Sequence, residues 1–192
     1  MKAPSFPSPP ASSPASLLHK AVNPVVRKLL PKLAVRPYGM HPLAWAIFIR
    51  SGVPVSRIGQ CIGHALASKG THGKTGVYRG ADYGACFDLH VLDLTHEQAV
   101  RNVVMPLSAL GIVVFLRVPG ADGWPSSQAY HAHCIYPGCN MTVQVAHQVQ
   151  DWLATPMLNG LARHLPYNLY SVTSALRQAV IRLFAQHKIV VI

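Results

Sequence analysis

The order of elements between residues 86 and 136 constrains the fold more than any other feature of this sequence. Cys86–Leu92 alternates in a way that predicts a strand, and Thr95–Leu110 has the periodicity of a helix. Ile112–Arg117 is a short apolar run that predicts a second, more buried strand, and Tyr130–Tyr136, after a loop with Pro and Gly, is predicted to be a third. This order predicts an α+β domain with a small antiparallel sheet flanked by helices.

The helix over Thr95–Leu110 has the clearest boundaries in the sequence. Thr95 can cap its N-terminus, Gln98 occupies the third position of a capping box, and Gly111 ends it. Four other segments are expected to be helical: His41–Ser51, Val55–Ser68, Gln144–Ala154 and Tyr170–Gln186. We expect Gly70–Gly80 to form a loop, because it is rich in Gly and Thr.

The chain has 192 residues, which is a one-domain length with room for a tail. Residues 1–16 are rich in Pro and Ser, so we expect a disordered tail there. Residues 17–39 form a basic arm interrupted by prolines, and the α+β domain is expected over residues 40–165. Residues 166–192 would then be a C-terminal helical extension.

The charge of the chain is unevenly distributed along its length. Residues 1–80 contain eleven Lys and Arg and no Asp or Glu, and the net charge of the whole chain is +11. This balance suggests either an anionic partner, such as nucleic acid or an acidic wall polymer, or a solvated basic tail. No helix-turn-helix, zinc-finger or RNA-binding aromatic motif supports nucleic acid.

The sequence shows neither a secretory signal nor a membrane helix. Residues 1–16 lack an apolar segment, and no apolar run approaches the ~20 residues of a membrane span. The cellular compartment is therefore left open. The four cysteines are an even number, and Cys134 and Cys139 flank a Pro-Gly turn that a local disulfide would bridge.

Side chains that can bind a metal gather on the predicted strands. Cys86, Asp88 and His90 are two residues apart, so they share one face of their strand. His131 and His133 share a face of another strand in the same way. If the two strands pair, or flank Ile112–Arg117, these side chains converge on a zinc site. Alternatively, the histidines are structural, and Asp88 caps a turn or pairs with Arg79 or Arg117.

The motifs of this region resemble those of the zinc D-Ala-D-Ala peptidases and L,D-endolysins, whose fold is shared by the hedgehog signalling domain. The likeness covers roughly residues 60–165. Its segments are Gly80–Asp88, Arg117, Pro119–Pro125 and Tyr130–His133. Gln148-Val149 and Asn159–His164 are also similar to a pattern in uncharacterised bacterial proteins.

The resemblance implies a zinc site built from specific residues. Gly84 fits the motif glycine, Asp88 the aspartate ligand and His131 the second histidine ligand, with His133 beside it. The first histidine ligand falls at Ala81, so His72 or His90 would have to replace it. The general base falls at Gln128, and an amide cannot accept a proton from water.

Three functions follow as hypotheses. The first is a zinc peptidase acting on peptidoglycan peptides, with Gln128 and Arg117 as candidate catalytic residues and Asp88, His131, His133 and His72 as metal ligands. The second is a binding module of the same fold without turnover. The third is nucleic-acid binding through the basic N-terminal half. The resemblance also implies association with the cell envelope.

Overall fold

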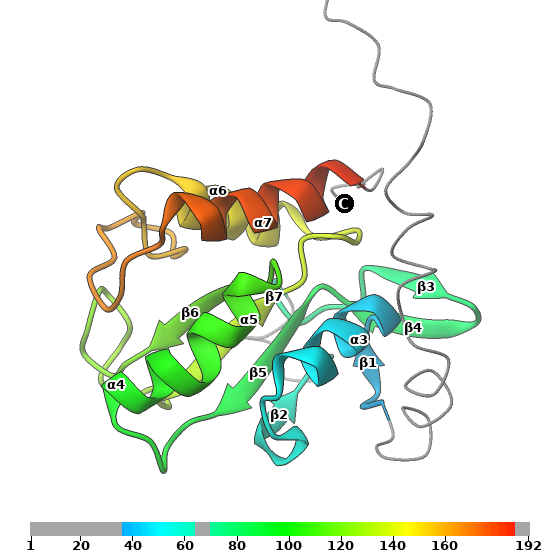
Figure 1. The fold of residues 1–192 in the computed structure, drawn as a ribbon, viewed down its shortest axis with the longest axis horizontal. Coiled ribbons are helices and arrows are strands. Elements are labelled where there is room, and N and C mark those ends of the chain that lie inside the picture. Colours follow the sequence, from blue (N-terminus) through cyan, green and yellow to red (C-terminus); the bar gives the residue numbers. More distant parts are fainter. Residues whose placement is uncertain (1–35, 64–69, 187–192) are drawn as a thin grey trace, which may run out of the picture. The chain divides into compact units, whose positions relative to one another are not determined.

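The computed structural model describes residues 36–63 and 70–186, and their elements form a mixed α+β fold, as predicted (Figure 1). The tail over residues 1–16 and most of the arm over residues 17–39 lie outside the described residues. The larger sheet has four antiparallel strands in the order β2-β5-β7-β6. They span Ile58–Gln60 (β2), Cys86–His90 (β5), His131–Ile135 (β7) and Val113–Arg117 (β6).

A second sheet of three short strands precedes β5 in the chain. Its order is β1-β4-β3, with β1 parallel to β4 and β3 antiparallel to it. The strands span Gly39–Met40 (β1), Ala81–Gly84 (β4) and Gly76–Tyr78 (β3). Strand β3 lies inside the segment expected to be a loop.

The predicted helix after β5 is present with the expected cap. Helix α4 (His96–Ala99) runs through a π-helical segment, η3 (Val100–Val104), into α5 (Met105–Ala109). Thr95 and Gln98 form the capping box, and Gly111 follows the helix with a φ of +91°. The other helices are α3 (Pro42–Ser51), α6 (Val143–Leu153) and α7 (Ser174–Gln186). None of the described helices is long and apolar enough to cross a membrane.

The helix predicted over Val55–Ser68 is wrong where the structure describes it, and residues 64–69 lie outside the described part. A single 3-10 turn, η1 (Val55–Arg57), leads directly into strand β2. Ile58 pairs with Leu89 at the edge of β5, and the imidazole of His90 lies where a Cβ of Gly59 would be. Strand pairing and this close contact outweigh the apolar periodicity of the segment.

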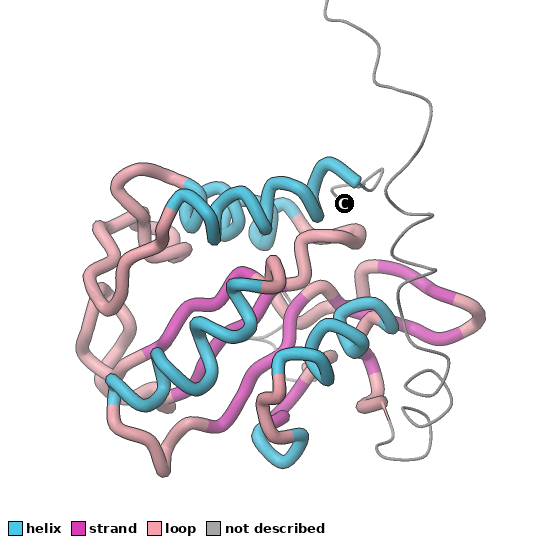
Figure 2. The backbone as a smooth tube through the Cα atoms, viewed as in Figure 1, coloured by secondary structure: helices cyan, strands magenta, loops and turns pink. Residues whose placement is uncertain are grey.

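Helices cover one face of the larger sheet. Figure 1 and Figure 2 show α3 and α5 on the same side of it, and Phe48 of α3 meets Phe87 of β5 with ring centroids 6.0 Å apart. Because side chains alternate along a strand, Asp88 points to the opposite face. The candidate site therefore lies on the face that α3 does not cover.

The outer edge of β6 is capped by side chains from the C-terminal part of the chain. Tyr167 hydrogen-bonds both the N–H and the C=O of Leu116, and Trp152 and Tyr170 donate to the carbonyl of Val114. Helix α7 packs against α5. Tyr167 and Tyr170, in the segment predicted as a C-terminal extension, thus provide hydrogen-bond partners for backbone groups at the outer edge of the sheet.

The four cysteines are buried free thiols. No disulfide joins Cys134 to Cys139, so the bridge that their spacing would allow is not formed. The sulfur of Cys134 instead donates to the carbonyl of Ala132, and that of Cys139 to the carbonyl of Tyr136.

Candidate metal centre

Strand register brings the predicted site residues together. β5 pairs directly with β7, with Asp88 opposite His133 and His90 opposite His131. β7 also pairs with β6, which places Arg117 opposite His131. Opposed residues on antiparallel strands point to the same face, so these side chains share one surface of the sheet. Of the two arrangements that the sequence allowed, the structure therefore has the one in which the Asp88 strand and the His133 strand pair directly.

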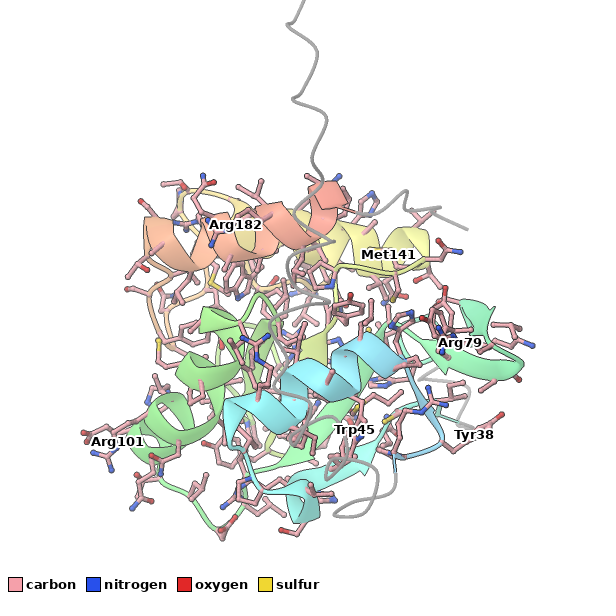
Figure 3. The ribbon with its side chains drawn as sticks, turned by 45° about the vertical axis from the view of Figure 1, so that its right-hand side comes forward. Tyr38, Trp45, Arg79, Arg101, Met141 and Arg182 are labelled. Carbon is pink, nitrogen blue, oxygen red and sulfur yellow. The ribbon has the colours of Figure 1, made fainter. Side chains whose placement is uncertain are left out.

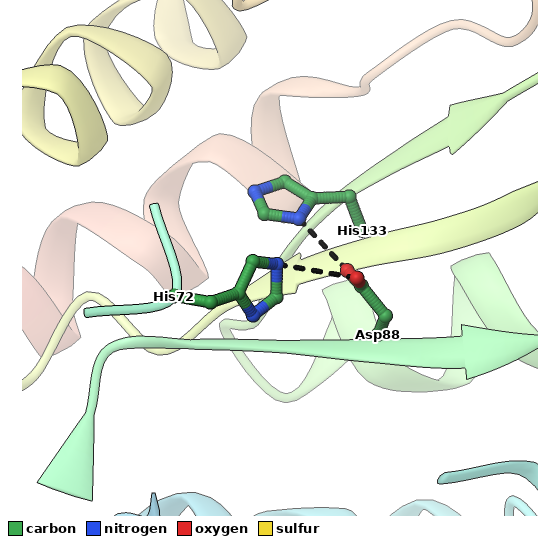
Figure 4. A group of neighbouring side chains, drawn as sticks. All are labelled: His72, Asp88 and His133. Atoms are coloured by element: carbon green, nitrogen blue, oxygen red, sulfur yellow. Dashed lines mark hydrogen bonds and ion pairs between the residues drawn. The ribbon is translucent and has the colours of Figure 1, made fainter. Parts of the chain in front are cut away.

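The third member of the centre, His72, comes from the segment between β2 and β3. Its Nε2 lies 3.2 Å from Oδ2 of Asp88, and Nδ1 of His133 lies 2.9 Å from Oδ1 (Figure 4). One ligand atom from each of the three residues lies within 4.8 Å of the others. The two imidazoles are buried, while the Asp88 side chain keeps 17% of its surface exposed. One carboxylate and two imidazoles can therefore bind a metal ion here.

The outer hydrogen bonds of the imidazoles fix which ring nitrogens face inward. Nδ1 of His72 lies 2.8 Å from the carbonyl oxygen of Cys61, and Nε2 of His133 lies 3.2 Å from Oε1 of Gln148. Both outer partners are acceptors, so with the hydrogens on these outer nitrogens the inner nitrogens present lone pairs to Asp88. Three acceptors then converge on one point, and they require a cation between them. Such outer partners are typical of histidines that bind metals.

The pKa values indicate which of these groups carries a proton when no metal is bound. Burial alone would raise the pKa of Asp88, but hydrogen bonds from His133 and His72 hold it well below its usual range. Burial would lower the pKa of His72, yet its bond to Asp88 outweighs this and raises it. Burial lowers the pKa of His133 to about 4, despite the bond to Asp88. Of the two imidazoles, His72 therefore retains a proton more readily.

His131, also predicted as a metal ligand, lies next to the group of His72, Asp88 and His133. Its Nδ1 lies 2.9 Å from the carbonyl oxygen of Ala129, and its Nε2 lies 3.8 Å from Oδ1 of Asp88. The ring packs against Trp124 with centroids 5.4 Å apart. Burial lowers the pKa of His131, which favours the neutral imidazole with an unprotonated Nε2 on the side of Asp88.

Arg117 places a buried positive charge next to the centre. Its guanidinium donates to the carbonyl of Asn159 at 2.6 Å and lies 4.6 Å from the ring centroid of Phe115. It also lies 5.4 Å from the ring centroid of Trp124. Burial lowers the pKa of Arg117 to about 10, so it remains charged at neutral pH. Asp88 is thus paired with histidines, not with Arg117 or Arg79, which lies at the turn after β3 (Figure 3).

A pocket of about 520 Å³ opens onto the centre. Asp88 is the only carboxylate among the described residues that line it. Gln128 lines the pocket as an exposed residue of the loop before β7, so the position predicted for a general base holds an amide. Other residues that line the pocket are Gln60, His90, Arg117, Trp124, Tyr130, His131 and Gln144.

The remaining candidates lie apart from the three ligand-capable groups. His90 is exposed and packs on Gly59, and Cys86 is fully buried in the core. Ala81 pairs with Tyr78 in the β3–β4 hairpin. Of the two replacements considered for the missing histidine at position 81, the structure brings His72 to Asp88.

The sequence did not predict the two amide side chains that contact Asp88 and His133. Gln60 of β2 donates to Oδ2 of Asp88 at 3.0 Å, and Gln148 of α6 contacts His133. Only Gln148 carried a signal, as part of a motif with no assigned role. No protein-family model, curated protein or solved structure was found to match this chain, so what the centre can do rests on its own residues.

Proposed function

We propose that the protein is a zinc-dependent peptidase-like domain that acts on or recognises the peptides of a cell wall. The observation that carries the proposal is the convergence of His72, Asp88 and His133 at the wall of a pocket. Two imidazoles with one carboxylate favour zinc over magnesium or calcium, which prefer oxygen ligands. Three protein ligands beside an open space are typical of a catalytic rather than a structural zinc site.

Each residue of the centre has a role that its position supports. Zinc, when bound, would polarise a substrate carbonyl and activate water for attack. His72, Asp88 and His133 would hold the ion through the atoms that face one another. No second carboxylate lines the described part of the pocket, so the proton acceptor must be another group. His131 lines the pocket, and its Nε2 can take this role.

The electrostatics of the pocket support an anionic ligand. A divalent ion would outweigh the charge of Asp88, and Arg117 adds a buried positive charge at the same face. A free carboxylate at the end of a peptide is a group that such a pocket attracts. The choice of wall peptides rests on the resemblance of Gly84 and Asp88 to the peptidase motif, with His133 rather than His131 in the place of its second histidine ligand, and on the basic N-terminal half of the chain.

The alternative is a binding module that holds the same ligand without cleaving it. The amide of Gln128 at the expected position of the general base favours this alternative. Nucleic-acid binding has less support. No nucleic-acid-binding motif accompanies the basic charge of residues 1–80.

A cleavage assay distinguishes these alternatives. Zinc-loaded protein is incubated with purified peptidoglycan and with synthetic peptides ending in D-Ala-D-Ala, and the products are identified by mass spectrometry. We expect zinc-dependent cleavage that His133→Ala abolishes. Arg117→Met should raise KM more than it lowers kcat, whereas Arg101→Met, an exposed residue outside the pocket, should change neither.

A further variant tests the missing carboxylate. Gln128→Glu adds a proton acceptor at the pocket, so it should increase cleavage if the site is otherwise competent. If wild type and Gln128→Glu both bind zinc and peptide but cleave neither substrate, the binding module is the correct function. If neither binds the peptides, the proposal is wrong.

A further inference from the structure

Behind His133, on the side away from Asp88, lies a chain of hydrogen bonds that the ligand set does not include. Gln148, on helix α6, is buried with 4% of its surface exposed. Its Oε1 lies 3.2 Å from Nε2 of His133, and its Nε2 donates to the carbonyl of Gly160 at 3.1 Å. Both ends of the amide are therefore engaged.

The Gly160 peptide is itself held in place. Its N–H donates to Oδ2 of Asp151 at 3.1 Å, and Asp151 also accepts from Nδ1 of His164. Gly160 has a φ of +65°, and a Cβ there would lie 2.8 Å from the Phe115 ring. Asp151 thus holds the N–H of Gly160, and close packing restrains the same residue, whose carbonyl receives the Gln148 amide.

This fixed carbonyl determines how the Gln148 amide is oriented. A carbonyl oxygen can only accept, so the NH₂ group of Gln148 must face Gly160 and its oxygen must face His133. Nε2 of His133 then carries the hydrogen, and Nδ1, the nitrogen 2.9 Å from Asp88, is left as the metal ligand. Without a metal, a neutral His133 has one hydrogen for two acceptors, Asp88 and Gln148. With a metal on Nδ1, every polar group in this series of hydrogen bonds, from His133 through Gln148 to Gly160, has a partner.

We propose that Gln148 is a positioning residue that makes His133 bind the metal through Nδ1, and that Gly160 and Asp151 hold Gln148 in the required orientation. This inference rests on the metal binding of the proposed function. It gives a role to Gln148 and to Gly160 in the Asn159–His164 segment, which the sequence singled out without an explanation.

The test compares zinc affinity, measured by competition with a chelator, among four proteins. Gln148→Leu removes the acceptor, so we expect zinc affinity to fall about 10- to 100-fold, as for other outer partners of metal ligands. Gln148→Glu keeps an acceptor for Nε2–H and should bind zinc within a few-fold of wild type or more tightly. Gln150→Leu is the matched control. Gln150 is an exposed residue of α6 outside the pocket and outside the hydrogen bonds to His133, so this variant should leave affinity unchanged.

A spectroscopic readout separates positioning from general support of the fold. In the zinc-loaded wild type, ¹⁵N NMR of the imidazoles should show His133 protonated at Nε2 and metal-bound at Nδ1, and Gln148→Leu should lose this signature. If Gln148→Leu binds as tightly as wild type, or Gln150→Leu weakens binding equally, this inference alone is overturned. If wild type binds no divalent metal, the proposed function fails as well.

Discussion

Asp88 is the residue through which the site is organised. It lies in hydrogen-bond range of His72, His133 and Gln60, and no arginine of the described residues forms an ion pair with it. A carboxylate between two imidazoles, each with an outer carbonyl-type acceptor, has its charge balanced only by protons or by a metal ion. The chemistry of the site therefore depends on which of these cations Asp88 holds.

At the residue scale, competition between protons and zinc predicts a pH dependence. Nε2 of His72 must lose its proton to bind a metal, and the contact with Asp88 raises the pKa of His72. Zinc affinity should thus weaken as pH falls, beginning closer to neutrality than for an ordinary histidine with a pKa of about 6.5. The slope should approach about tenfold per pH unit for one displaced proton. His133 adds little there, because its pKa is about 4.

The measurement is a chelator competition at several pH values from about 8 to about 6, the range in which histidine titrates. The chelator's own protonation is corrected for at each pH. Affinity that stays constant down to the lowest of these values would show that His72 does not exchange a proton for the metal.

At the scale of elements, the sequence predicted the strands better than their surroundings. Alternation, a capping box and a terminal glycine are local signals. They made four elements recognisable: strands β5, β6 and β7, and the helix from His96 to Ala109. Strand β2 was mistaken for a helix, because its pairing with β5 is a contact between distant segments.

The site was predictable to a similar extent. Asp88, His131 and His133 follow from strand periodicity and from the resemblance. The choice of His72 over His90, however, depends on how the segment before β3 folds back onto β5, and no local pattern encodes that path. Gln148 acts through a helix that lies far along the sequence from Asp88, so its role became visible only in the structure.

The Gly160 segment gives a prediction at this scale. Gly160→Ala should destabilise the fold more than Gly80→Ala, although both glycines have positive φ values, +65° and +81°. A Cβ at Gly80 meets nothing within 4 Å, whereas at Gly160 it would lie 2.8 Å from Phe115. We expect a cost of about 1 kcal/mol for backbone strain in both, and about 1–3 kcal/mol more at Gly160 from overpacking.

Urea unfolding of the two variants measures this difference. Since Phe115 lies opposite His133, Gly160→Ala should also weaken zinc binding, and Gly80→Ala should not. Equal unfolding free energies for the two variants would contradict the close packing that fixes the Gly160 carbonyl.

At the scale of the whole molecule, helices bury one face of a small antiparallel sheet, and the candidate metal centre with its pocket lies on the other. The C-terminal segment caps the outer edge of β6, and α6 reaches the centre through Gln148. A metal ion that binds the folded chain alone should stabilise this whole arrangement, by about 2.7 kcal/mol when zinc is present at a hundred times its Kd.

Calorimetric titration of the metal-free protein with zinc tests the central claim most directly, with His72→Ala and His90→Ala as a matched pair. Both substitutions remove an imidazole from the lining of the pocket, but only His72 belongs to the group that can bind a metal. We predict one zinc per chain for wild type and for His90→Ala, and no stoichiometric binding for His72→Ala. Absence of binding by wild type, or equal binding by His72→Ala, would contradict the assignment of His72, Asp88 and His133 as a metal centre.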